Sequence, residues 1–184
     1  MSVTALPRAA LALLAAMVGG CRRSAATDGP VTHVENHFAF SVHGPLERVV
    51  PFFGGWQERA WAGDGWTPVF LYPVPARDEQ GEVFTLKHDL GEATWVNTIL
   101  DLRAGRFQYV YVIPRVVATL IDIEATRAGA AHTHVEVTYR RTALDPRHNA
   151  HVAAMGDHDR MSGPEWEAQL EAVVAAADPA TAGQ

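Results

Sequence analysis

Alternating apolar and polar residues dominate the chain between residues 34 and 143. In residues 34–42 the residues Val34, Asn36, Phe38, Phe40 and Val42 fall on one face. A period of two predicts a strand. The same pattern predicts strands at 69–72, 82–87, 93–102, 106–113, 116–125 and 132–143. Short connections rich in Gly, Pro and Asp separate most of them, which favours antiparallel neighbours.

Residues 132–143 have one apolar and one polar side. Val135, Val137 and Tyr139 share a side, and Arg140 falls on the other. This pattern is typical of a strand with one buried face. Asp122 and Glu124 alternate with isoleucines in the preceding strand, so we expect these acids to pair with Arg140 on the wet face.

Helical spacing occurs in three places. Residues 45–53 predict a short helix that ends at Gly54-Gly55, and residues 56–61 predict another. A last helix is predicted from Pro164, because apolar residues recur at steps of three and four as far as Ala177. Residues 145–163 show no such period, and we expect them to be a long polar connection. The predicted fold is α+β in the order β-α-α-β6-α: a seven-stranded curved antiparallel sheet that wraps its C-terminal helix.

The first 21 residues have a different character. After Arg8 comes an apolar run from Ala9 to Val18, which is too short for a helix that spans a membrane. Val18-Gly19-Gly20-Cys21 resembles the bacterial lipobox, in which cleavage before the cysteine exposes the residue that carries the lipid. We therefore expect a signal peptide at 1–20 and lipidation at Cys21. The alternatives are cleavage after Ser24-Ala25-Ala26, which would release a soluble protein, and a retained anchor helix.

These boundaries predict four regions. Residues 21–30 would be the lipidated cysteine and a flexible tether, residues 31–178 one domain, and residues 179–184 a disordered tail. Arg22, directly after the cysteine, is not the Asp that resembles an inner-membrane retention signal. We therefore expect an exported protein of the cell envelope, anchored in the outer membrane and facing the periplasm.

Several segments, in this order, resemble the helix-grip superfamily, also called START-like or SRPBCC, with its lipid-transport and polyketide cyclase/dehydrase members. Residues 40–49 are similar to its passage from first strand to first helix. Residues 109–114 with 121–124 are similar to its central hairpin, and residues 135–144 and 166–170 to its last strand and helix. The resemblance covers residues 34–177. It implies a cavity between the sheet and the terminal helix. The chain departs from many members at the long polar segment 145–163, which we expect to lid or block the mouth of the cavity.

Aromatic residues are the candidate lining of that cavity. The candidates are Trp95, Phe107, Tyr109, Tyr111, Tyr139 and Trp166. Aromatic side chains are usually buried in any fold, so each of them could equally fill the core. A ligand for such a cavity would be a hydrophobic small molecule or a lipid.

Catalytic and metal chemistry have little support in the sequence. The chain has no Gly-x-Ser-x-Gly elbow, phosphate loop or dinucleotide motif, and its one cysteine is at the predicted anchor. His148, His151 and His158 lie close together, but their spacing matches no known zinc motif. We expect no cofactor, no metal and no catalytic residue.

Charge limits the partners. The chain has 15 Lys+Arg against 21 Asp+Glu, a net charge of −6. An acidic surface repels phosphate backbones, so we expect no nucleic-acid partner and a membrane partner only through the lipid anchor. Three functions stay open: a lipoprotein that binds or carries a hydrophobic small molecule, a cyclase- or dehydratase-like enzyme, and an envelope scaffold without a cavity.

Overall fold

The computed structural model describes residues 29–177. The predicted signal peptide, Cys21, most of the tether and the tail at 179–184 lie outside the described residues. No helix in the described range is both long and apolar enough to cross a membrane.

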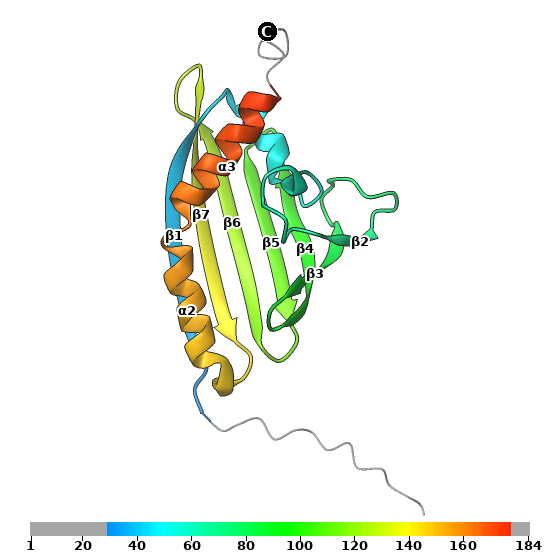
Figure 1. The fold of residues 1–184 in the computed structure, drawn as a ribbon, viewed down its shortest axis with the longest axis vertical. Helices are drawn as coiled ribbons and strands as arrows, with labels where there is room; N and C mark the ends of the chain where they lie inside the picture. Colours follow the sequence, from blue (N-terminus) through cyan, green and yellow to red (C-terminus); the bar gives the residue numbers. More distant parts are fainter. Residues whose placement is uncertain (1–28, 178–184) are drawn as a thin grey trace, which may run out of the picture.

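Seven strands form one antiparallel sheet (Figure 1), which confirms the predicted fold class. They are β1 His33–His43, β2 Val69–Tyr72, β3 Val83–His88, β4 Gly91–Asp101, β5 Arg106–Ile113, β6 Val117–Arg127 and β7 His132–Ala143. Their order in the sheet is β1-β7-β6-β5-β4-β3-β2, so β1 and β2 are the edges. From β2 to β7, strands that are consecutive in the chain are neighbours in the sheet, as is usual for antiparallel strands joined directly.

Helical segments cover one face of the sheet, which we call the concave face. The segment after β1 forms α1 (Leu46–Val49), which continues as the 3-10 helix η1 (Val50–Phe53), and a second 3-10 helix, η2 (Gln57–Ala60), follows. Both predicted short helices are therefore present. Phe53 is fully buried, and its ring packs 5.2 Å from that of Phe107, which fixes η1 against the sheet.

The C-terminal helix α3 (Gly163–Ala176) lies on the same face, along β1 (Figure 1). Trp166 packs edge-on against Phe38 at 5.4 Å and Trp61 at 5.1 Å. Leu170 and Val174 are buried one and two turns further on. The predicted amphipathic stripe is therefore the face that α3 buries.

The prediction of an irregular connection at 145–163 was wrong. This segment forms the 3-10 helix η3 (Pro146–His148) and the helix α2 (Asn149–Asp159), which packs on β1 and β7. Only Val152, Gly156 and Asp159 of α2 are buried. Such a narrow contact, made partly by a glycine and a carboxylate, leaves no hydrophobic period in the sequence to detect.

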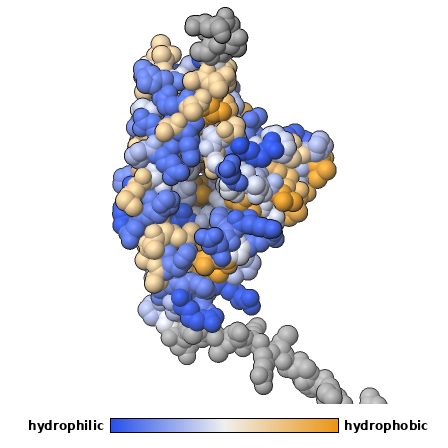
Figure 2. All heavy atoms as spheres, in the orientation of Figure 1, coloured by the Kyte–Doolittle hydropathy of each residue, from blue (hydrophilic) through white to orange (hydrophobic). Residues whose placement is uncertain are grey.

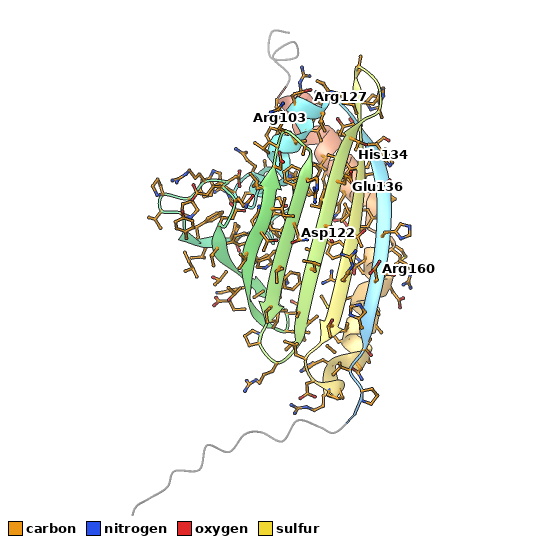
Figure 3. All side chains as sticks on the ribbon, turned by 180° about the vertical axis from the view of Figure 1, so that it is seen from behind. Arg103, Asp122, Arg127, His134, Glu136 and Arg160 are labelled. Atoms are coloured by element: carbon orange, nitrogen blue, oxygen red, sulfur yellow. The ribbon has the colours of Figure 1, made fainter. Side chains whose placement is uncertain are left out.

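The opposite face of the sheet faces solvent, and Figure 3 shows it with Asp122, His134 and Glu136 labelled. Arg140 donates to Asp122 and, at 2.8 Å, to Glu35 of β1. The predicted pair with Asp122 is confirmed. The pair with Glu124 was wrong, because the register sets Glu124 opposite Glu136.

Apolar side chains are exposed around the edge strand β2. Val69, Leu71, Tyr72 and Val74 are between 54% and 79% exposed. Figure 2 shows an apolar patch over β2 and the loop after it, at the right-hand margin of the view.

Candidate ligand-binding site

One row of side chains crosses the concave face from β3 to β7. Phe84 is opposite Trp95, which is opposite Tyr111. Thr119 of β6 is opposite Tyr111, and Arg141 of β7 is opposite Thr119. Residues directly opposite each other in antiparallel strands share a face. The row therefore runs from flat aromatic rings to a guanidinium group.

A cavity of about 450 Å³ lies over this row. Its size is within the range of roughly 300–1,000 Å³ that is usual for small-molecule sites. Its lining comes from the sheet, from the loop after η2 and from α2. The lining residues are Ala62, Gly65, Trp66, Leu86, Lys87, His88, Asp89, Trp95, Tyr111, Tyr139, Arg141, Met155 and His158.

A second cavity, of about 210 Å³, adjoins the first. Ala62, Trp66 and His158 line both cavities, so the two meet at these side chains. The smaller cavity continues along α3 to Trp166 and also reaches Glu58 of η2.

Arg141 is the buried cation of the larger cavity, with only 6% of its surface exposed. Its Nε donates to Asp159 Oδ2 and its Nη2 to Asp159 Oδ1, both at 2.7 Å. Its Nη1 donates to the Tyr111 hydroxyl and, at 3.2 Å, to Thr119 Oγ1. Burial by itself would lower the pKa of Arg141, but the hydrogen bonds and charge of Asp159 raise it overall. The guanidinium is therefore charged, and Asp159 neutralises it.

His88, at the end of β3, stacks on the aromatic rings of the row. Its ring is 5.5 Å from that of Tyr111 and 6.1 Å from that of Trp95, within 14° of parallel to each. Burial lowers the pKa of His88, and the positive charge of Arg141 lowers it further. The imidazole is therefore neutral at pH 7.

Two buried nitrogen atoms of this stack have no hydrogen-bond partner within the described residues. They are Trp95 Nε1 and His88 Nε2. An indole N–H can only donate, and buried tryptophans usually find an acceptor for it. Trp66, which lines the same cavity, follows that rule, because its Nε1 donates to Gly55 O at 2.9 Å.

Buried acids hold the segment that carries η1 and η2. Glu82 Oε1 accepts from Gly55 N at 3.1 Å and from Asn97 Nδ2 at 3.3 Å. Burial raises the pKa of Glu82 to about 7, and the charge of Asp78 adds to the increase. Burial, followed by the charges of Glu82 and Asp78, raises the pKa of Glu58 well above its usual value.

The structure brings together some of the predicted aromatic residues. Trp95, Tyr111 and Tyr139 line the larger cavity, and Trp166 lines the smaller one. Phe107 and Tyr109 line neither cavity. Both are buried beneath η1, where the Tyr109 hydroxyl donates to Phe53 O.

The histidines proposed as weak metal candidates are spread over η3 and α2. His148 ends η3, and His151 and His158 lie two helical turns apart on α2. Within residues 29–177 no three His, Cys, Asp or Glu side chains are close enough to hold a metal ion. His158 instead lines both cavities.

Sequence reasoning missed Trp66, His88, Met155 and the Arg141–Asp159 pair. Arg141 had a detectable signal, because the alternation of 132–143 puts it on the same side as Val137 and Tyr139. A charged residue on a buried face usually has a partner and often a function. Trp66, Met155 and Asp159 had no such signal, because Trp66 and Met155 reach the cavity from a loop and from α2, and Asp159 reaches Arg141 from the end of α2.

No protein-family model and no curated protein sequence matches this chain. Solved structures do. Norcoclaurine synthase from Thalictrum flavum, solved with dopamine and hydroxybenzaldehyde, matches with a TM-score of 0.58 at 10% identity, over 80% of this chain and 90% of that chain. The chain has the helix-grip fold.

Two further structures agree with this fold. The di-domain aromatase/cyclase BexL of the BE-7585A biosynthetic pathway matches with a TM-score of 0.56 at 15% identity, over 75% of this chain and 46% of that chain. The hypothetical protein jhp0584 from Helicobacter pylori matches with a TM-score of 0.58 at 8% identity, over 78% and 88%. Similarity at such low identity shows the fold alone.

Proposed function

We propose that this protein is an envelope lipoprotein that binds or carries a hydrophobic small molecule in its helix-grip cavity. The observation that carries the proposal is the open cavity of about 450 Å³, with Trp66, Trp95, Tyr111 and Tyr139 in its lining. Norcoclaurine synthase, which has a similar fold, holds the aromatic molecules dopamine and hydroxybenzaldehyde. The lipid anchor rests on the lipobox-like segment that ends at Cys21.

The test places a larger side chain of α2 in the cavity. Met155 lines it, and Met155→Trp adds a bulky ring in place of a flexible side chain. We expect the neutral fluorescent probe N-phenyl-1-naphthylamine to bind the full-length protein with micromolar affinity and Met155→Trp to weaken binding at least about 10-fold. A fluorescence titration measures both.

Met161→Trp is the matched control. Met161 is 69% exposed in the bend between α2 and α3 and lines neither cavity. This variant should bind the probe as the wild type does. Failure of the wild type to bind, or equal loss in both variants, would contradict the proposal.

An enzyme of the cyclase or dehydratase type is the second candidate. A neutral His88 is a possible general base, and the Tyr111 hydroxyl, held by Arg141, is a possible donor to a carbonyl oxygen. The similarity to the aromatase/cyclase BexL also favours it. Loss of water from a poly-β-ketone probe, absent in His88→Gln, would support this function over simple carriage.

The third function, a scaffold with a solid interior, has less support. The exposed apolar side chains around β2 would suit an interaction surface. However, two adjoining cavities on the concave face do not fit the solid core that this function predicts.

A further inference from the structure

We infer that the larger cavity selects a neutral, planar aromatic molecule that bears an acceptor oxygen, such as a ketone, quinone or phenol, over fatty acids and other anionic lipids. This inference rests on the proposed function and narrows its ligand class. It follows from the shape of the cavity floor, from two unpartnered nitrogen atoms and from the charge balance of the lining.

The shape of the floor favours a flat ligand. The rings of Trp95 and Tyr111 are 4.2 Å apart with 25° between their planes, and His88 lies nearly parallel to both. Trp66 meets Trp95 edge-on, at 5.3 Å and 78°, and so stands as a wall beside this stack. Aromatic rings prefer offset-stacked or edge-on neighbours, and this corner offers both to one planar ring system.

The Trp95 indole N–H requires an acceptor, and the His88 imidazole offers a second donor in the tautomer that carries its proton on Nε2. Trp95 is 5% exposed, yet its Nε1–H has no acceptor among the described residues, and Nε2 of the stacked His88 has no partner there either. A buried donor without an acceptor is costly, so a ligand oxygen that accepts from it gains more than a purely apolar group does. An acyl chain against this stack would leave both nitrogen atoms unsatisfied.

The charge balance disfavours ions. Each nitrogen of the Arg141 guanidinium already donates, and Asp159 supplies the matching negative charge. A ligand carboxylate would meet a guanidinium whose charge is already balanced by Asp159, itself 2% exposed, and a ligand cation would face Arg141. His88 is neutral, and at the rim Lys87 and Asp89 carry opposite charges. A neutral ligand avoids the cost of burying an unpaired charge.

The experiment compares probes that share one skeleton. Fluorene has no oxygen, 9-fluorenone adds a single ketone, and fluorene-9-carboxylate adds an anion. Displacement of N-phenyl-1-naphthylamine from the full-length protein measures their relative affinities. We expect 9-fluorenone to bind about 3- to 10-fold more tightly than fluorene, as one hydrogen bond allows, and the carboxylate to bind most weakly.

Three variants test which side chains cause the preference for 9-fluorenone over fluorene. Trp95→Phe removes the free N–H, and His88→Phe replaces the imidazole with a flat ring that has no nitrogen. In each, the preference for 9-fluorenone should shrink towards 1. Trp66→Phe is the matched control, because its N–H already donates to Gly55 O. It should weaken 9-fluorenone and fluorene equally and leave their ratio unchanged.

Equal binding of fluorene and 9-fluorenone by the wild type would overturn this inference, and so would tightest binding of the carboxylate or of oleate. A preference that persists in both Trp95→Phe and His88→Phe would also overturn it. In each case the proposed function would stand, because N-phenyl-1-naphthylamine would still bind in the cavity. If that probe does not bind at all, the proposed function itself fails. Should one variant not fold, the wild-type ratio and the other variant still decide.

Discussion

Arg141 and Asp159 form the buried ion pair that joins the cavity floor to α2. Both side chains are almost fully buried, and two parallel hydrogen bonds connect them. Bidentate pairs of this kind have a well-defined geometry. The pair therefore both fixes the last turn of α2 and holds the guanidinium against Tyr111.

Removing one partner of this ion pair should lower the stability of the folded protein. Asp159→Asn leaves the buried Arg141 charge without its counter-ion, and we expect a loss of about 3–5 kcal/mol in the free energy of unfolding. Urea denaturation measures it. Asp157→Asn, also on α2 but at an exposed ion pair with Arg160, should cost less than about 1 kcal/mol. Similar losses in the two variants would show that the buried pair has no special role.

Glu82 should make stability depend on pH. Its pKa is raised from 4.5 to about 7, chiefly by burial, so the folded protein holds this proton more tightly than the unfolded chain does. The contribution to stability is fully present below about pH 4.5 and is lost as the pH rises through about 7. We expect the free energy of unfolding to fall over this range, and less steeply in Glu82→Gln.

Thermal unfolding across pH 4 to 9 tests this. In Glu82→Gln the stability should still fall somewhat as the pH rises, because burial also raises the pKa of Glu58 and Asp78. Glu92→Gln, at an exposed position of β4, is the control and should follow the wild-type curve. An unchanged slope in Glu82→Gln would rule out Glu82 as its source.

Helix α2 depends on close approach to the sheet more than on hydrophobic area. A Cβ atom at Gly156 would lie 2.8 Å from Asn36 Nδ2 and 3.0 Å from a Val34 methyl carbon. Glycine usually weakens a helix interior, by about 1 kcal/mol relative to alanine. Here it lets α2 lie directly on β1, which brings Met155 and His158 to the cavity.

A larger side chain at this position should displace α2. We expect Gly156→Leu to lower the free energy of unfolding by about 1–3 kcal/mol or more, because the added atoms overlap β1. Ala153→Leu, on an exposed position of the same helix, should change stability by less than about 0.5 kcal/mol. Differential scanning calorimetry compares the two. Equal melting temperatures would show that the contact of α2 with β1 is loose.

At the scale of the whole domain, the helices of residues 29–177 lie on the concave face and leave the opposite face of the sheet to solvent (Figures 1 and 3). The described chain begins beside the start of α2, where Asn149 Nδ2 donates to Pro30 O at 3.0 Å. If Cys21 carries a lipid, only a few residues separate the membrane from this contact. The proposed anchor would thus keep the cavity near a membrane surface.

The mass of the mature N-terminus tests the anchor. We expect the chain to begin at Cys21 with an attached diacylglyceryl group, and Cys21→Ala to block cleavage and keep residues 1–20. Cleavage after Ala26 would instead give Thr27 as the first residue in both proteins. A retained helix would give the uncleaved chain in both. Either result would contradict lipidation.

The sequence by itself determined the strands, the short helices after β1, and α3. Most of these elements have one buried face and one exposed face, so apolar residues recur along them at a regular period. The alternation also predicts Tyr139 on the buried side of its strand, and the resemblance to the helix-grip superfamily made Trp95 and Tyr111 candidates for a cavity, which is why part of the cavity floor could be predicted.

Only the tertiary structure decided which of these aromatic residues surround open space and which fill the core. Tyr109 and Tyr111 are two residues apart on β5 and share a face, yet η1 covers the first and the cavity lies over the second. The structure also decided α2, the Arg141–Asp159 pair and the wall formed by Trp66. These depend on contacts between distant segments, and such contacts leave no local period in the chain because each segment contributes only one or two residues to them.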